Sequence, residues 1–330
     1  LWLVLLLAYL FEFANGWTDA PNSIATVVST RVLRPHHAVI MAGVLNLAGA
    51  LLIGTAVAKT IAAGIVDPNQ VTLETVAASL LAATVWALGA QYFGLPSSES
   101  HALVAALLGS GFAAGGLGAL EWEGTRKSLI GLVTSPVGGF LGGFLLMVLV
   151  YRLFARVRRP IVSRVFGRLQ ILSAGFMALS HGTGDGQKTM GVITLAVLLD
   201  RAGSAGRVPA EFPIPVWVIV SAAVVMGLGT MIGGWRVVRT MGLRMTHLEP
   251  VQGFAAETAA ATVITAAARV GIPVSTTHAI GTSIMGVGAT RRFSAVRWGV
   301  AGQVVAAWIL TWPSCAVLGY LLERTFRLAL

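Results

Sequence analysis

Apolar segments of about 20 residues recur along the whole chain, and they limit the fold more than any other feature does. A helix of that length crosses a hydrocarbon core of about 30 Å. Of the 330 residues, 56% are hydrophobic and 11% are charged, whereas roughly one-quarter of the residues in an ordinary soluble domain are charged. No stretch has the composition of a separate soluble domain. The sequence therefore predicts an all-α integral membrane protein whose solvent is the lipid bilayer.

The net charge of +10 raises the question of a nucleic-acid partner. The arginines fall mostly between apolar segments and form no stripe with interleaved aromatic residues, so no nucleic-acid partner is expected. The most basic loop runs from Arg152 to Arg168. Since cytoplasmic loops of membrane proteins carry an excess of Lys and Arg, we expect the middle of the chain to lie in the cytoplasm.

Several apolar segments are short and are interrupted by Gly, Pro and polar residues. The segments lie at 1–14, 20–33, 37–58, 71–93, 98–118, 128–151, 169–181, 187–199, 213–234, 251–270, 276–290 and 295–322. The interruptions at 15–22 and 181–188 separate segments that are too short to span a bilayer. Short, interrupted segments of this kind indicate broken helices or re-entrant hairpins.

The chain contains an internal repeat. GLPSSESHAL begins at Gly94 and GIPVSTTHAI begins at Gly271, and Gly, Pro, Ser, His and Ala coincide between them. Earlier in each half a Gly is followed three residues later by an Asp, in NGWTDAPN at 15–22 and HGTGDGQK at 181–188. The sequence therefore predicts two repeats, at 1–160 and 161–330. A repeat with an odd number of crossings reverses its orientation on the second pass, which predicts inverted topology with a binding site where the halves meet.

Each of the first pair of motifs has the pattern of a helix start. A proline precedes a run of hydroxyl residues that leads into an apolar segment, with Ser in the position of an N-cap. Free backbone N–H groups, the positive end of the helix dipole and hydroxyl donors together suit an oxyanion. The hydroxyl residues expected to bind it are Ser97, Ser98 and Ser100 in the first half and Ser275, Thr276 and Thr277 in the second.

The second pair of motifs places Asp19 and Asp185 in segments that are otherwise poor in charge. A carboxylate at membrane depth costs on the order of 2.5 kcal/mol or more unless it is compensated, so both need a cationic partner. Lys188 follows Asp185 by three residues and is expected to face it. Asp19 has the neutral Asn22 at the same spacing, so a bound cation is the expected partner of Asp19. Oxygen ligands suit Na⁺, and a protonatable carboxylate suits H⁺.

Four further titratable residues lie next to these motifs. His101 and His278 occupy matching places in the repeat and are candidate proton carriers, since histidine titrates near neutral pH. Glu99 lies inside the first expected anion-binding turn and is a candidate proton site that could donate to the anion. Glu12 lies under two turns of helix before Asp19 and could face the same cavity.

These motifs, with HGTGDGQKTMG at 181–191 and GIPVSTTHAIG at 271–281, resemble the signatures of the inorganic phosphate transporter (PiT) family over essentially the whole chain. The resemblance implies two inverted repeats, commonly dimeric, that move inorganic phosphate with Na⁺ or H⁺ through the cell membrane, most often a bacterial or archaeal inner membrane. Some bacterial members carry metal–phosphate complexes. The resemblance matches the motif aspartates to Asp19 and Asp185, with a possible Na⁺ bound there, and places Asn22, Gln187 and Lys188 beside them. No other cofactor is implied.

The chain departs from the family pattern at three positions. The family commonly has Asn immediately before each motif Asp, where this chain has Thr18 and Gly184, and Glu99 replaces a residue that is often hydroxylic. The loss of both amides alters the expected Na⁺ ligands, so these departures favour H⁺ coupling or a changed cation site.

Two other functions fit parts of the pattern. The GTGD sequence at 182–185 fits the GxGD pattern of intramembrane aspartyl proteases, with Asp19 as the second acid, but a protease has no need of duplicated serine-rich helix starts. Sulfate or another tetrahedral oxyanion would also fit helix N-termini and hydroxyls. Phosphate can donate a hydrogen bond to a carboxylate and sulfate cannot near neutral pH, so the embedded acids favour phosphate.

Overall fold

The computed structural model describes residues 1–52, 54–205, 207–209 and 211–329, and these are almost entirely helical. Its elements are α1 (Trp2–Ser29), α2 (Pro35–Leu52), α3 (Ala56–Ala63), α4 (Leu73–Phe93), α5 (Glu99–Gly115), η1 (Gly116–Ala119), α6 (Trp122–Leu153), α7 (Arg159–Ala205), α8 (Val216–Thr230), α9 (Trp235–Arg239), η2 (Thr240–Arg244), α10 (Pro250–Arg269), α11 (Thr276–Ala289), η3 (Phe293–Ala295) and α12 (Trp298–Ala329). The chain is an all-α membrane protein, as its sequence predicts.

Several of these helices have the length and composition of membrane spans. Five are long and apolar enough to cross a bilayer, or up to six if the bent pair of α8 with α9 and η2 counts as one span. Large apolar side chains are exposed along α6 and α12, for example Leu145 and Ile309 at 62% and 68%. Exposure of that kind is costly in water and favourable in lipid.

Two helical hairpins form the centre of the fold. Helix α4 turns into α5, and α10 turns into α11. Each turn begins with a glycine in the left-handed region, Gly94 at φ 68° and Gly271 at φ 70°. Because only glycine adopts that conformation without steric cost, these two positions account for the matching Gly-x-Pro sequences. That the hairpins turn back inside the bilayer stays a prediction.

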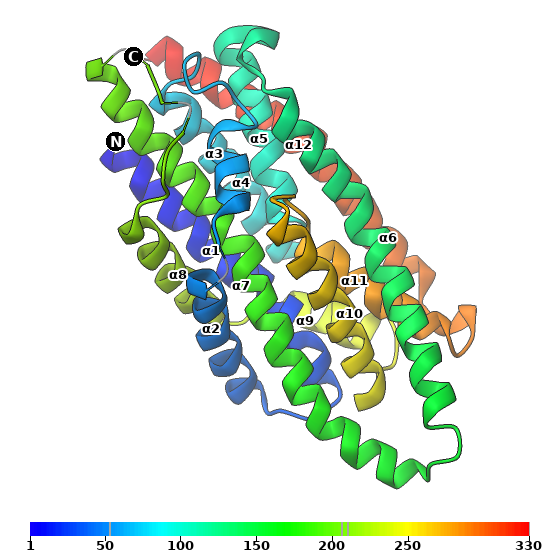
Figure 1. Cartoon of the computed structure of the whole chain (residues 1–330). Coiled ribbons are helices and arrows are strands. Elements are labelled where there is room, and N and C mark those ends of the chain that lie inside the picture. Colours follow the sequence, from blue (N-terminus) through cyan, green and yellow to red (C-terminus); the bar gives the residue numbers. More distant parts are fainter. Residues whose placement is uncertain (53, 206, 210, 330) are drawn as a thin grey trace.

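The contacts between helices come in matching pairs across the two halves. Helix α5 packs on α12 as α11 packs on α6, α4 on α1 as α10 on α7, and α8 on α1 as α2 on α7. The N- and C-termini lie at one end of the molecule and the α6–α7 connection at the other, so the second half runs back along the first (Figure 1). Two inverted repeats divided near residue 160 would pack in this way, and that division stays a prediction.

The expected breaks in α1 and α7 are wrong. Segments 1–14 and 20–33 form one continuous 28-residue helix, and 169–181 and 187–199 lie within one 47-residue helix. Even Pro21 is accommodated inside α1. The polar residues at 15–22 and 181–188 are buried against other helices, where they find hydrogen-bond partners, so they do not interrupt the helices that carry them.

Candidate functional site

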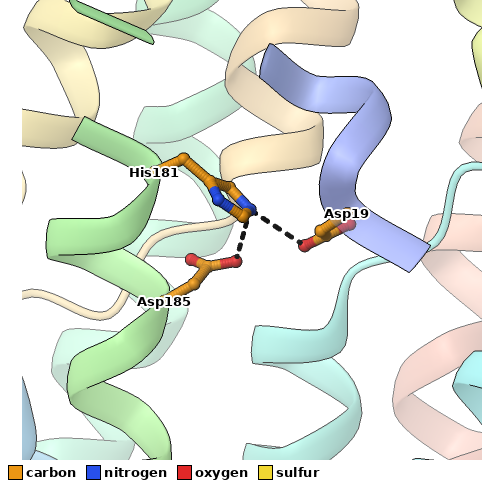
Figure 2. A group of neighbouring side chains, drawn as sticks. All are labelled: Asp19, His181 and Asp185. Carbon is orange, nitrogen blue, oxygen red and sulfur yellow. Dashed lines mark ion pairs between the residues drawn. The ribbon is translucent and has the colours of Figure 1, made fainter. Parts of the chain in front are cut away.

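The two motif aspartates and a histidine meet where α1 crosses α7. Figure 2 shows Asp19 on α1 facing His181 and Asp185 on α7. Nε2 of His181 lies 3.3 Å from Asp185 Oδ2 and 3.8 Å from Asp19 Oδ2. One ligand atom from each of the three residues lies within 4.8 Å of the others, and all three side chains are buried. Two carboxylates and an imidazole at this separation form a candidate cation site.

The second nitrogen of the His181 ring determines what its first nitrogen can do. Nδ1 lies 3.2 Å from Asn46 Oδ1, and Asn46 is itself oriented by donating its amide N–H to Thr230 at 2.8 Å. An amide oxygen only accepts, so Nδ1 carries the proton. In neutral histidine the lone pair of Nε2 would then face two carboxylates. The arrangement is favourable only when Nε2 is protonated or when a cation lies between the nitrogen and the carboxylates.

Lys188 connects this cluster to the first hairpin. Its ammonium group donates to Asp185 on its own helix and to Ser100 in the first turn of α5. The Asp185–Lys188 contact predicted from their spacing is therefore present. Because Lys188 is 2% exposed, its charge is desolvated and depends on these partners.

The tip of the second hairpin lies on the two aspartates. Thr276 donates to Asp185 at 3.1 Å and Thr277 donates to Asp19 at 3.0 Å. Asn22, one turn after Asp19 on α1, donates to both threonine hydroxyls, at 3.2 and 3.0 Å. Each carboxylate is thus paired with a hydroxyl donor at the start of α11.

The tips of the two hairpins also contact each other. Ser98 and Ser275 are the N-caps of α5 and α11, and accept from the backbone N–H of His101 and His278 at 3.3 and 3.1 Å. Ser100 donates to the carbonyl of Val274 at 3.1 Å. The N-terminal ends of two helices, with their hydroxyls, therefore meet beside Lys188, as an anion site would require.

The comparisons with known proteins agree with this geometry. The model of the phosphate transporter family matches residues 15–319. The chain belongs to the phosphate transporter family. A probable low-affinity inorganic phosphate transporter of Rhizobium meliloti (strain 1021) is 47% identical over 95% of this chain and 92% of its own, and one of Bacillus subtilis (strain 168) is 41% identical over 96% and 94%.

A solved structure shares the whole fold. A structure titled as the sodium-dependent phosphate transporter matches with a TM-score of 0.90 at 25% identity, and covers 99% of both chains. The relatives and this structure are transporters, so the intramembrane-protease interpretation of GTGD is set aside. Membership of this family also agrees with a chain that crosses the membrane several times.

Two of the departures from the family pattern contact each other. Thr18 donates to Glu99 Oε1 at 2.9 Å, and Ser97 donates to the same oxygen at 3.2 Å. The other oxygen, Oε2, is buried and has no hydrogen-bond partner among the described residues. Glu99 thus lies at the first hairpin tip next to the motif of α1, where it was predicted to lie; its role as a proton site stays a prediction.

The two matching histidines lie together and share no hydrogen bond with the acids among the described residues. The rings of His101 and His278 are 4.7 Å apart between centroids, and Trp308 lies 4.0 Å from His278. The ring nitrogens are buried and have no hydrogen-bond partner within the part of the chain that the structure describes. The structure thus shows no hydrogen-bonded route from these rings to Asp19 or Asp185, and proton transfer by them stays a prediction.

Gln187 has partners away from the hairpin tips in this structure, and its expected role in phosphate binding stays a prediction. Its amide oxygen accepts from the backbone N–H of Val57 at 2.9 Å, and its amide nitrogen donates to the Thr183 carbonyl at 2.9 Å. Gln187 therefore stabilises the start of α3, whose first-turn N–H groups have no partner inside that helix. It follows Asp185 by two residues, which on a helix turns it away from the Asp185 face that bears Lys188 and His181.

Sequence reasoning missed His181 as a site residue. It lay in a quoted motif, and its spacing of four residues before Asp185 was the available signal, because residues four apart share a helix face. Glu257 on α10 was also left without a role. It is buried and accepts from Thr26 of α1 and from Ser173 and Gln170 of α7.

Proposed function

We propose that this chain carries inorganic phosphate across the cell membrane in symport with a cation that binds among Asp19, His181 and Asp185. The observation that carries the proposal is the position of His181 Nε2, which lies 3.3 and 3.8 Å from two buried carboxylates and is favourable there only with a positive charge, either a proton on Nε2 or a bound cation. The phosphate would bind beside this cation, at the hydroxyls and helix N-termini of the two hairpin tips.

The coupling between cation and phosphate follows from the hydroxyl groups that donate to the two aspartates in this structure. Thr276 and Thr277 donate to Asp185 and Asp19, so their hydroxyls are engaged when no cation neutralises the acids. A cation at the acids would replace these donors and release both hydroxyls for the phosphate. It would also remove a repulsion of about 4 kcal/mol between unit charges ~4 Å apart at an effective dielectric of 20. Each ligand thereby raises the affinity for the other, which is the thermodynamic basis of symport.

Phosphate is favoured over sulfate by the acid at the first tip. The unpartnered Oε2 of Glu99 lies buried in the same turn as Ser98 and Ser100. A protonated phosphate oxygen can donate to it, whereas sulfate has no proton to donate near neutral pH. Sulfate would leave that carboxylate oxygen without a donor, which is costly in a buried site.

The identity of the cation is open to direct measurement. The structural neighbour is named as sodium-dependent, but this chain has Thr18 and Gly184 where the family commonly has amide ligands for Na⁺. Purified protein in proteoliposomes should take up labelled phosphate when a cation gradient is imposed, and Na⁺ and pH gradients applied separately identify which ion drives it. Uptake that is absent under both gradients, or is blocked equally by sulfate, contradicts phosphate symport.

Variants at the site test its location. Asp185→Asn removes a carboxylate from the cation cluster and leaves the buried Lys188 without its ion-pair partner, at a cost of about 3–5 kcal/mol. Ser275→Ala removes the N-cap at the second tip, at a cost of about 1 kcal/mol. Both should abolish uptake, and denaturation of the purified variants checks that each still folds. Asp67→Asn is the matched control, because Asp67 lies in the loop before α4 and its side chain accepts only from Asn69 and Gln70 among the described residues. Normal transport by both site variants would place the site elsewhere.

A dimer of this unit is expected from the family resemblance, and the mass of the purified protein in solution measures it.

A further inference from the structure

A second buried acid lies on the α1–α7 interface outside the site described above. Glu12 is 0% exposed and accepts from the hydroxyl of Thr189 on α7. Asn15, one turn later on α1, donates its amide N–H to the same carboxylate oxygen, Oε2, at 3.4 Å. The three residues belong to the same two helices as Asp19 and Asp185, but share no hydrogen bond with those aspartates in the described part of the chain.

Two oxygen atoms of this cluster have no partner. Glu12 Oε1 and Asn15 Oδ1 are both buried, and neither accepts a hydrogen bond from any described residue. Buried carboxylate and amide oxygens are normally paired, because leaving one without a donor forfeits its hydration. A proton on Oε1 would neutralise the carboxylate and turn that oxygen into a donor, for which Asn15 Oδ1 on the next turn of α1 is a candidate acceptor.

Another buried glutamate, Glu257, has hydrogen-bond donors on both of its carboxylate oxygens. Glu257 Oε1 accepts from Thr26 and Gln170, and its Oε2 accepts from Ser173. Three donors on two oxygens stabilise the charged form of an acid. Glu12 has the same burial, but its Oε1 has no donor among the described residues, so fewer hydrogen bonds stabilise its charged form.

We propose that Glu12, Asn15 and Thr189 form a second cation site, separate from the Asp19–His181–Asp185 cluster, and that its occupant is a proton. Binding of the proton rests only on this geometry, whereas its role in coupling rests on the proposed phosphate symport. The charged groups that act on Glu12 from the helix packed against it are Asp185 and Lys188 of α7.

The position of the site gives it an effect on the anion. Glu12 precedes Asp19 by seven residues, which is about 10 Å along the helix axis. Thr189 directly follows Lys188, the cation at the first hairpin tip. At an effective dielectric of about 20, removing one negative charge at ~10 Å raises the affinity for a monovalent anion about 15-fold. Protonation of Glu12 would therefore favour phosphate binding without any contact between them.

The proton is tested first, without phosphate. Infrared difference spectra of the purified wild-type protein should show a protonated-carboxyl band that disappears as the pH rises, and Glu12→Gln should remove that band. Thr189→Val takes a donor away from the carboxylate and should move the midpoint of the band to higher pH, so the assignment does not depend on one variant. If no band is lost in Glu12→Gln, or if added Na⁺ removes the band at constant pH, the assignment of a proton is overturned.

Phosphate binding tests the role in coupling. At about pH 9, where phosphate is divalent, the Glu12→Gln protein should bind phosphate at least about 15-fold more tightly than the wild type, and at about pH 5 the two should bind equally. Tyr9→Phe is the matched control on the same helix, because Tyr9 donates to Ser221 of α8 at 2.8 Å and has no hydrogen bond to either cluster among the described residues, and it should follow the wild-type profile. If the carboxyl band titrates but the phosphate affinity of Glu12→Gln equals that of the wild type, the proton site is supported and its role in coupling is refuted.

Discussion

Lys188 donates to Ser100, and this hydrogen bond joins the long helix of the second half of the chain to the hairpin tip of the first. The same ammonium group is the ion-pair partner of Asp185. A cation site and the start of a helix that suits an anion are therefore connected through one buried side chain. Movement of the first hairpin would change the partners of Lys188, and with them the charge balance of Asp185.

Replacing Lys188 by Met should abolish phosphate uptake and destabilise the protein. Without the ammonium group Asp185 is a buried charge that keeps only Thr276 and His181 as partners, and breaking a buried pair in this way costs about 3–5 kcal/mol. Chemical denaturation of the purified protein measures the stability, and proteoliposomes measure the uptake.

The double variant Lys188→Met/Asp185→Asn separates the two effects. Removing both charges should restore much of the stability lost in Lys188→Met, because no uncompensated charge remains, while uptake should stay absent. A double variant that is less stable than Lys188→Met would show that the pair is not the source of the loss.

Thr277 tests the proposed release of hydroxyl donors. Thr277→Val removes the hydroxyl that donates to Asp19 and accepts from Asn22, and should weaken phosphate binding at least tenfold, since one lost hydrogen bond to a charged group is worth about 1.5–3 kcal/mol. Thr277→Ser keeps the hydroxyl and should retain uptake. If Val and Ser behave alike, the hydroxyl of Thr277 is not a ligand.

The sequence predicted the residues that meet at the site better than the shape of the helices that carry them. Polar residues inside an apolar segment signal either a break in the helix or a polar contact with another helix, and one sequence does not distinguish the two. Asn22 illustrates the second case, since its partners Thr276 and Thr277 are more than 250 positions away. The Gly-x-Pro turns depend on a local conformation instead. The left-handed backbone at Gly94 and Gly271 favours glycine, so the residue type itself indicates the turn.

His181 and Gln187 show that a motif match does not give the direction of each side chain. Both lie in the same eight-residue motif, yet His181 faces the aspartates and Gln187 faces α3. Their places relative to Asp185, four before and two after, fix these directions once the segment is known to be helical. The expected break at 181–188 removed that information, so His181 was missed and the contact of Gln187 with α3 was not predicted.

Glu257→Gln should lower stability although Glu257 lies outside the candidate site. Its carboxylate accepts from Thr26, Ser173 and Gln170, and an amide group cannot accept on its nitrogen, so at least one donor loses its partner at a cost of about 1–3 kcal/mol. Thr258→Val is the matched control at the next residue, because the Thr258 hydroxyl has no hydrogen-bond partner in the described ranges. Equal stabilities of the two variants would mean that the carboxylate is not held by these donors.

Glycines set how closely the hairpins approach the helices behind them, and they offer a test of the duplication. A Cβ added at Gly109 of α5 would lie 1.9 Å from the carbonyl oxygen of Ala316 on α12, and one at Gly286 of α11 would lie 2.2 Å from that of Phe140 on α6. Both contacts are with backbone, so the helices must separate. Gly109→Ala and Gly286→Ala should each cost at least about 1–3 kcal/mol and slow transport.

The two glycines lie at the same distance after the Gly-x-Pro turn of their own half, so duplicated units predict similar losses from the two variants. Gly89→Ala on α4 is the control, because nothing lies within 4 Å of its added Cβ, and it should be neutral or up to about 1 kcal/mol more stable. Denaturation curves of the three purified variants make the comparison. A large loss of stability in Gly109→Ala together with no loss in Gly286→Ala would mean that the two hairpins are not packed in equivalent ways. The description of the fold as two matching halves would then be wrong for the hairpins.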